Sequence, residues 1–251
     1  MRQQFNLSSR TNMTWSIIAK DNSTGQIGIA VATKFFAVGA RVPHIAARLG
    51  GIATQALVNP YYGIDGVKLL HEGREPGDIV KTLIAGDGGR ESRQLHIMDA
   101  KGRIAAHTGR DCVDWCGHIQ GDGFSIAGNM LAGAAVLDDT AKAYVANAKL
   151  PFAQRLIAAM HAGEAAGGDK RGKQSAVLLI HGDEEWSALN LRVDDHVDPL
   201  RELERLEQVS RERWVHFRAF LPTRDNPAGI TDRATIDAGV AAGIAAMAAK
   251  T

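Results

Sequence analysis

Several features that commonly identify a protein class are scarce or missing in this sequence of 251 residues. Only two cysteines, Cys112 and Cys116, are present, too few for the disulfide framework of a small secreted protein. No run of 18 or more apolar residues occurs, and residues 1–12 lack the apolar segment of a secretory signal. The formal net charge is +1, so no overall field attracts nucleic acid or an anionic membrane. We therefore expect a cytoplasmic globular protein without nucleic-acid or membrane partners.

Familiar cofactor and nucleophile motifs are missing as well. Cys112, Cys116 and His118 lie close together, but zinc sites use paired C-x2-C elements and four ligands, so we expect no metal. Gly167-Gly168 lacks the surrounding pattern of a phosphate-binding loop, and no G-x-S-x-G nucleophile elbow occurs. The sequence therefore predicts neither an organic cofactor nor a standard α/β-hydrolase.

The apolar pattern that is present predicts an α+β protein. Strands come in groups with helices between the groups, which favours antiparallel sheets covered by helical layers. We divide the chain into a leader or mis-called start (1–13), a main domain (14–196) and a helical extension (197–251). A loop is expected through Trp115 and His118. The expected strands are 14–20, 26–33, 49–56, 94–99, 103–108, 123–129, 175–181 and 186–193, and the expected helices are 64–71, 75–85, 136–147, 151–162, a charged one from 199 and an Ala-rich one over 231–250.

The first predicted strand begins with a hydroxyl residue, Thr14, directly after Met13. If the chain began at Thr14, one residue would supply both a nucleophilic hydroxyl and a basic α-amine. The alternative is a β-branched residue in an edge strand. Lys34 ends the second strand, and antiparallel pairing would return it towards Thr14, where a cation lowers the pKa of the amine and of the hydroxyl. Lys34 could equally be a solvated lysine at a strand end.

Acyl transfer also needs donors that stabilise a developing oxyanion. Gly50-Gly51, Thr54-Gln55 and Gly128-Asn129 are candidates because each lies near the end of a predicted strand. Asn129 could instead cap the following helix, a common role of asparagine. The acidic segment 194–198 precedes a predicted helix, where Asp residues are typical caps, so we interpret it as a capping segment.

Several motifs in a fixed order resemble one bacterial family, catalogued as domain of unknown function 1028. The resemblance covers about Thr14 to Asp195. The motifs are Met13-Thr14-x-Ser16-Ile17, Ala32-Thr33-Lys34-Phe35 with Val38-Gly39, Ala53-Thr54-Gln55-Ala56 with Asn59-Pro60, Gly117-His118, Gly128-Asn129-Met130-Leu131, and Ala165-Ala166-Gly167-Gly168-Asp169-x-Arg171-Gly172.

That family is similar to the N-terminal nucleophile (Ntn) hydrolases, and the resemblance implies a four-layer αββα sandwich with amide-bond hydrolysis. Thr14 would be the nucleophile and, through its amine, the general base. Lys34 would lower pKa values at the site, and Gln55 and Asn129 would contact the transition state. A role in the substrate pocket, or in holding turns, would fall to Ser16, Asn59, His118, Asp169 and Arg171.

We therefore expect an amidohydrolase that cleaves a small amide, an N-acyl amino acid or a short peptide. Residues 1–13 conflict with this, because they turn the amine of Thr14 into an amide unless they are removed. Two alternatives stay open: a non-catalytic ligand-binding module on the same fold, and a hydrolase of another acyl bond such as a lactone or an ester. The amphipathic helix with Leu200, Leu203 and Leu206 favours a packing or subunit-contact face, so we expect a homo-oligomer.

Overall fold

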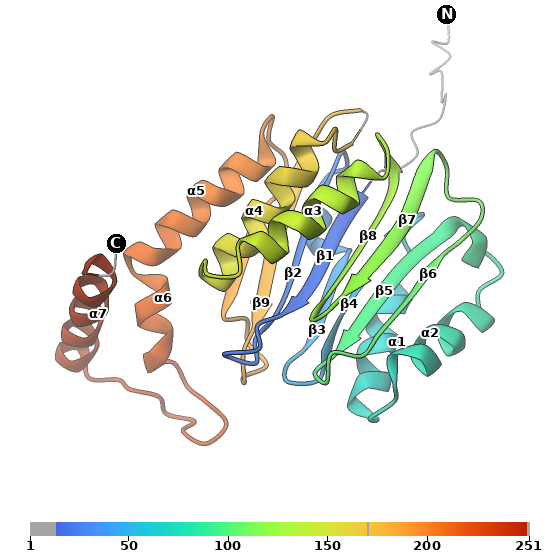
Figure 1. Ribbon diagram of the computed structural model, residues 1–251. Helices are drawn as coiled ribbons and strands as arrows, with labels where there is room; N and C mark the ends of the chain where they lie inside the picture. The colour runs from blue at the N-terminus through green and yellow to red at the C-terminus, as the bar shows by residue number, and fades with distance from the viewer. Residues whose placement is uncertain (1–13, 170, 250–251) are drawn as a thin grey trace, which may run out of the picture.

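The structure, a computed structural model, describes residues 14–169 and 171–249. In this part of the chain two antiparallel sheets lie face to face between helices (Figure 1). The first sheet has six strands in the order β10 (Leu189–Val193), β9 (Ser175–His181), β2 (Ile27–Thr33), β1 (Thr14–Lys20), β8 (Phe124–Leu131) and β7 (Trp115–Gly121). The second has four strands in the order β3 (Pro43–Ala46), β4 (Gly50–Ala56), β5 (Arg93–Asp99) and β6 (Ile104–Thr108).

Strand β1 occupies a central position in the six-stranded sheet, because it pairs with β2 on one side and β8 on the other. Alternate side chains of a strand point to opposite faces of the sheet. Trp15 and Ile17 therefore pack towards helices, and Ile18 packs towards the other sheet. This alternation also sends the side chains of Thr14 and Ser16 into the space between the two sheets.

Helices cover the outer face of each sheet. On the six-stranded sheet, buried apolar side chains of the strands pack against α3 (Ala135–Ala146), α4 (Phe152–Ala165) and α5 (Pro199–Glu212). On the four-stranded sheet, the covering helices are α1 (Pro60–His71) and α2 (Pro76–Ala85). Burial of both faces explains why a central strand such as β2 is a nearly continuous run of apolar and small residues.

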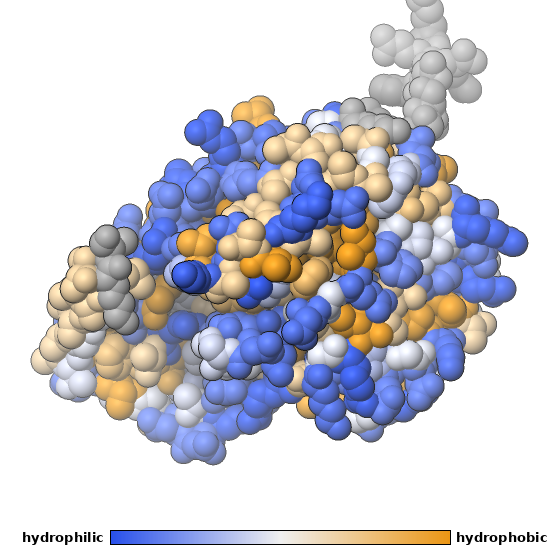
Figure 2. Space-filling model, in the orientation of Figure 1, coloured by the Kyte–Doolittle hydropathy of each residue, from blue (hydrophilic) through white to orange (hydrophobic). Residues whose placement is uncertain are grey.

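The end of the chain extends beyond these layers. Helix α5 is part of the core, since Leu200 and Leu203 are buried against the sheet and α4. The following α6 (Trp214–Phe217) contacts α5, and α7 (Arg233–Ala248) contacts α6 at one end of the molecule (Figure 1). Figure 2 shows a largely apolar surface over the Ala-rich α7. Short 3-10 helices occur at η1 (Val38–Ala40), η2 (Arg90–Ser92) and η3 (Arg218–Phe220).

The fold differs from the sequence predictions at several boundaries. Pro60 begins helix α1 instead of ending regular structure, because Asn59 caps the helix and a proline at the first position needs no amide donor. The expected loop at Trp115 and His118 is the edge strand β7, whose partly exposed side chains hide the apolar signal of a strand. Strand β3 was not predicted, and Pro151 precedes α4 as its N-cap residue.

Within residues 14–169 and 171–249, no helix is both long enough and apolar enough to cross a membrane. The expected leader, residues 1–13, lies outside the described residues.

Candidate active site

The candidate site begins at the first residue of β1. The register of the sheet places Thr14 opposite Thr33 of β2 and opposite Asn129 of β8. The hydroxyl oxygens Oγ1 of Thr14 and Thr33 lie 3.1 Å apart, within hydrogen-bond distance. Both residues are buried, so the Thr14 side chain is held in one orientation by its neighbour on the adjacent strand. Sequence analysis did not identify Thr33 as a site residue.

Gln94 of β5, which the sequence analysis also did not predict as a site residue, is the hub that joins the two sheets at this point. Its Nε2 donates to two backbone carbonyls of the six-stranded sheet, Gly117 O at 3.0 Å and Gly128 O at 2.9 Å. Because a carbonyl can only accept, these contacts fix which end of the amide carries the nitrogen. The Oε1 atom of Gln94 therefore faces Gln55 and Asn129, which donate to it at 2.8 and 3.1 Å.

The orientation of Gln94 fixes the amides of Gln55 and Asn129 in turn. Each amide nitrogen has two hydrogens, and in both residues the second acceptor is the carbonyl oxygen of Thr14, at 3.5 Å from Gln55 Nε2 and 3.3 Å from Asn129 Nδ2. All four donor hydrogens are thus directed to atoms of the protein. The two amides thus hold Thr14 itself in place, and their expected contact with a transition state stays a prediction.

The same orientation of the Asn129 amide leaves its acceptor oxygen, Oδ1, without a donor in the part of the chain that the structure describes. Asn129 is only 1% exposed, and within the described residues its Oδ1 has no hydrogen-bond partner. Buried polar atoms are rarely left in this state, because the loss of hydration is not offset. This unpaired oxygen belongs to Asn129, the cross-strand partner of Thr14. It therefore lies next to the residue that would carry out the candidate chemistry. The alternative that Asn129 caps a helix is wrong, since it lies inside β8.

A chain of hydrogen bonds continues from Gln55 into the interior. Ser16 Oγ donates to Gln55 Oε1 at 2.6 Å, so Ser16 must accept from His96 Nε2, 2.9 Å away. His96 Nδ1 then accepts from Ser125 Oγ at 2.9 Å. Complete burial lowers the pKa of His96 to about 3, with the charge of His118 as a smaller cause, so the ring is neutral. Ser16 is therefore part of the support beneath Thr14.

The pairing of β1 and β2 returns Lys34 towards the level of Thr14, one residue past the cross-strand partner Thr33. Lys34 follows Thr33, so the side chain that faces the Thr14 hydroxyl is a threonine. The exposed Lys34 Nζ donates to the carbonyl of Lys173 at 3.2 Å, and its backbone N–H donates to Asp169 at 2.8 Å. A strand alternates its faces, which is why a shift of one residue turns Lys34 away from the hydroxyl.

Asp169 and Arg171 lie in the segment that crosses the ends of β2 and β8. Asp169 forms an isolated bridge with Leu131, and its carboxylate is buried. Arg171 Nη2 lies 3.1 Å from that carboxylate, which also accepts from the backbone N–H groups of Lys34 and Arg171. These contacts fix the crossing segment at the ends of β2 and β8, the two strands that flank β1.

His118 of β7 lies near Gln94, separated from it by the hydroxyl of Thr108. Its Nδ1 lies 3.1 Å from Thr108 Oγ1, and that oxygen lies 2.9 Å from Gln94 Nε2 as a third acceptor that shares the two hydrogens of this nitrogen with the two carbonyls. Partial burial lowers the pKa of His118, and the charge of the nearby His107 is a second cause. His118 therefore reaches the polar cluster through one intervening hydroxyl.

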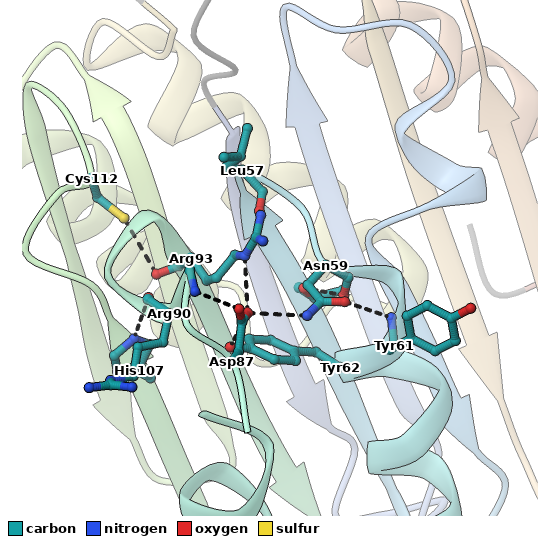
Figure 3. Close-up of polar contacts among 11 residues, drawn as sticks. Leu57, Asn59, Tyr61, Tyr62, Asp87, Arg90, Arg93, His107 and Cys112 are labelled. Atoms are coloured by element: carbon teal, nitrogen blue, oxygen red, sulfur yellow. Dashed lines mark hydrogen bonds and ion pairs between the residues drawn. The ribbon is translucent and has the colours of Figure 1, made fainter. Parts of the chain in front are cut away.

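Asn59 belongs to a separate cluster on α1 and the loop after α2 (Figure 3). It donates to the Asp87 carboxylate at 3.2 Å and caps α1 through Tyr61 N. Asp87 also accepts from Tyr62 and from Arg93, whose guanidinium donates to the carbonyl of Leu57 as well. Although burial opposes it, hydrogen bonds from Gly89, Tyr62 and Asn59 hold the pKa of Asp87 far below its usual range. This cluster fixes the turn that follows Gln55, so Asn59 holds a turn.

Two L-residues at the site have left-handed backbones. Ala56 follows Gln55 with φ 65°, and Met130 follows Asn129 with φ 56°. Such conformations are uncommon for residues other than glycine and concentrate at functional sites. Both strands thus bend immediately after the amide that binds Thr14 O.

The two cysteines interact with backbone groups. Cys112 Sγ donates to Arg93 O at 3.4 Å, and Cys116 Sγ donates to Cys112 O at 3.5 Å. Burial, with Cys116 as a second cause, raises the pKa of the Cys112 thiol to about 11. Among the described residues, no group of three or more His, Cys, Asp or Glu side chains is arranged to hold a metal ion.

The fold and site define a mixed α+β protein with two facing antiparallel sheets and a buried polar cluster at one end of the layer between them. Residues 14–203 match the model of the family described as "Family of unknown function (DUF1028)", so the chain belongs to this family. This confirms the resemblance drawn from the sequence motifs.

The chain is similar to solved structures, among them a strong likeness and a weak one. The crystal structure of protein SPO2555 from Silicibacter pomeroyi, described as a member of the same family, is 34% identical with a TM-score of 0.81 and covers 88% of this chain and 96% of that chain. Anbu (ancestral beta-subunit) from Yersinia bercovieri is 11% identical with a TM-score of 0.38, over 78% and 96% of the two chains. No curated protein matches the sequence.

A sequence signal exists for the residues that were missed. Gln94 and His96 are polar residues two apart in a strand whose other positions are mostly apolar. Thr14 and Ser16 repeat this pattern in β1. Since residues two apart share a face, such a pair predicts a polar patch inside a buried layer.

Proposed function

We propose that the protein is an N-terminal-nucleophile amidohydrolase on a four-layer αββα sandwich, with Thr14 as the nucleophile. Its substrate would be a small amide, an N-acyl amino acid or a short peptide. The fold supports the proposal through the position of Thr14 at the start of a central strand, between the sheets. No metal or organic cofactor is needed, because hydroxyl and amine come from the same residue.

The observation that carries the proposal is the unpaired Asn129 Oδ1 opposite Thr14. A free α-amine on Thr14 would supply the hydrogen donor that this buried acceptor lacks. The Gln94 hub prevents the Asn129 amide from turning, so Oδ1 stays available as an acceptor. The Asn129 side chain would then orient the amine towards the Thr14 hydroxyl.

The chemistry follows from these positions. The Thr14 hydroxyl attacks the substrate carbonyl and passes its proton to the α-amine. The amine gives the proton to the leaving nitrogen, and an acyl-enzyme on Thr14 Oγ1 remains. Water, activated by the same amine, then releases the acid. Thr33 would hold the hydroxyl in its reactive orientation through the 3.1 Å contact.

The proposal requires a free amine on Thr14. Removal of residues 1–13, by cleavage of the Met13–Thr14 bond or by loss of an initiator Met13, would provide it. The intact mass of the protein from its native host tests this step, and we expect a mature chain that begins at Thr14. A chain that retains residues 1–13 and still hydrolyses amides would contradict the free-amine mechanism.

Substitution of Thr14 in the full chain tests the nucleophile. Thr14→Ala should abolish hydrolysis of N-acyl amino acids, at least 100-fold below the unaltered protein, because both attack and acyl transfer need the hydroxyl. Thr14→Ser should retain measurable activity. Thr24→Ala removes an exposed threonine hydroxyl in the β1–β2 turn and serves as the matched control.

The substrate panel should also contain esters and lactones. If the protein cleaves only esters or lactones and this activity depends on Thr14, then Thr14 is still the nucleophile but the bond cleaved is not an amide. Ligand binding without turnover of any acyl compound by a chain that begins at Thr14 would favour the non-catalytic module.

A further inference from the structure

A groove of about 1020 Å³ opens next to the candidate site. One border is Lys34 and the two phenylalanines that follow it, and the other is the crossing segment with Arg171 and Lys173. Both borders adjoin Thr33: Lys34 is its chain neighbour, and the backbone N–H of Gln174 donates to Thr33 O at 2.9 Å. The groove therefore begins one residue from the cross-strand partner of Thr14.

The cations at this groove are not equivalent. Lys173 Nζ lies 2.9 Å from Glu164 and 2.8 Å from Asp198, so two carboxylates already balance its charge. Arg171 is paired with the buried Asp169. Lys34 Nζ donates to a backbone carbonyl, and among the ion pairs of the described residues none includes it. Of these three described side chains, Lys34 is the one that forms no ion pair with a carboxylate. Asp195 and His196 also line the groove, and the Asp195 carboxylate accepts from Gln174 Nε2 at 3.0 Å.

Apolar surface lies directly beside the charge of Lys34. Phe36 is 54% exposed, Phe35 38% and Val197 86%, and all three line the groove. Single exposed apolar residues are common, but two adjacent aromatic rings and a valine in one groove with a lysine form a combined apolar and cationic surface. A ligand that fits has an anionic end and an apolar or aromatic group.

The spacing matches a short substrate. Paired strand residues have Cα atoms about 5 Å apart and chain neighbours 3.8 Å apart, so Lys34 Cα lies within about 9 Å of Thr14 Cα. In an N-acyl amino acid, the carboxylate lies about 3.5 Å, one residue length, beyond the attacked carbonyl. The flexible lysine side chain can span the remaining distance.

We infer that this groove binds the free carboxylate of an N-acyl amino acid or of a short peptide, with Lys34 as the carboxylate anchor and Phe35 and Phe36 as the surface for its apolar side chain. This inference rests on the proposed function for the position of the scissile bond. It changes the role of Lys34 from lowering pKa values to selecting the substrate.

Two probes that differ only in charge test the inference by direct binding. N-acetyl-L-phenylalanine carries the carboxylate, and N-acetyl-L-phenylalaninamide does not. Titration calorimetry on the full chain with Thr14→Ala avoids turnover, so the result does not depend on catalysis. We expect about fivefold tighter binding of the acid at low ionic strength, and a smaller ratio in high salt.

Variants assign the effect to Lys34. Lys34→Met should reduce the ratio of the two affinities to about one, and Lys34→Arg should retain it. Lys142→Met removes an exposed lysine on α3 and should leave the ratio unchanged. Phe36→Ala should weaken both probes equally. Equal affinities in the parent chain, a preference that survives Lys34→Met, or no measurable binding of either probe would overturn the inference.

Kinetics on a chain with the native Thr14 separate this inference from the proposed function. Lys34→Met should raise KM about fivefold for the acid, with kcat unchanged and with no effect on the neutral amide. A fall in kcat for both probes would overturn the anchor role and return Lys34 to catalysis. Loss of all turnover with the binding preference intact would contradict the proposed function and leave the groove assignment standing.

Discussion

The layer between the two sheets has an apolar half and a polar half, and both are almost completely buried. In the apolar half, Ile18, Ile29 and Met98 pack across the layer. In the polar half, the same strands carry hydroxyl, amide and imidazole groups joined by hydrogen bonds. The change occurs within two residues, from Ser16 to Ile18 on β1 and from His96 to Met98 on β5. The polar half consists of Thr14, Ser16, Thr33, Gln55, Gln94, His96, Ser125 and Asn129.

The two halves hold the sheets together by different physics. Apolar burial is non-directional and tolerates small shifts of one sheet against the other. A buried hydrogen bond is directional, and an unpaired partner costs about 1–3 kcal/mol, so the polar half permits one arrangement only. The apolar half therefore supplies most of the free energy that holds the two sheets together, and the polar half fixes the position of Thr14.

Among the substitutions, removal of the hub residue Gln94 should have the largest effect on stability. Gln94→Met keeps the length of the side chain but leaves backbone acceptors at Gly117 and Gly128 and two amide donors without their partner. We expect a loss of about 4 kcal/mol in the free energy of unfolding, measured with urea. Leu95→Met, on the other face of the same strand, is the control and should cost less than about 1.5 kcal/mol. Equal losses in the two variants would show that the hydrogen bonds of Gln94 add nothing beyond an ordinary change of a buried side chain.

A cavity in the apolar half should cost somewhat less. Met98→Ala removes a fully buried side chain and should lower the free energy of unfolding by about 3 kcal/mol. Because the hydrogen bonds of the polar half stay intact, hydrolysis per folded molecule should stay within about twofold of the parent value. A collapse of activity in fully folded Met98→Ala would show that the halves are coupled.

Within the layer between the two sheets, acid should act on the polar half through the buried His96. His96 takes up a proton near pH 3 in the folded protein and near 6.5 when unfolded, so below 6.5 the unfolded chain binds more protons. Stability should fall as the pH decreases from about 6.5 towards 3, with His96 contributing about 1.4 kcal/mol per pH unit. His96→Phe should lack this part of the slope, and Met98→Leu should keep it. Parallel pH curves for all three proteins would contradict the assignment.

The smallest change tests tolerance in the apolar half. Ile29→Val deletes one buried methyl group and should cost about 1 kcal/mol in urea unfolding. The matched change in the polar half, Ser125→Ala, also deletes one atom, but it leaves His96 Nδ1 without its donor. We expect Ser125→Ala to cost more, by about 1 kcal/mol. The reverse order would mean that His96 finds another partner.

Much of the architecture could be predicted from local patterns. The hairpin of β1 and β2, the helices α2, α3 and α4 and the antiparallel class follow from periodicity and turn residues. The edge strand β7 could not be recognised, because its side chains are half exposed. Helix α1 began earlier than predicted, because proline both ends and begins helices and only the Asn59 cap distinguishes the two cases.

The sequence by itself determined that Thr14 begins a strand, that Gln55 and Asn129 lie near strand ends, and that the chain belongs with its family. These conclusions depend on residue order alone. The tertiary structure decided that Thr33, and not Lys34, faces Thr14, and that Gln94 turns two amides towards the Thr14 carbonyl. The physical reason is that strand register and the direction of a hydrogen bond arise between segments far apart in the chain, where one residue of shift reverses every face.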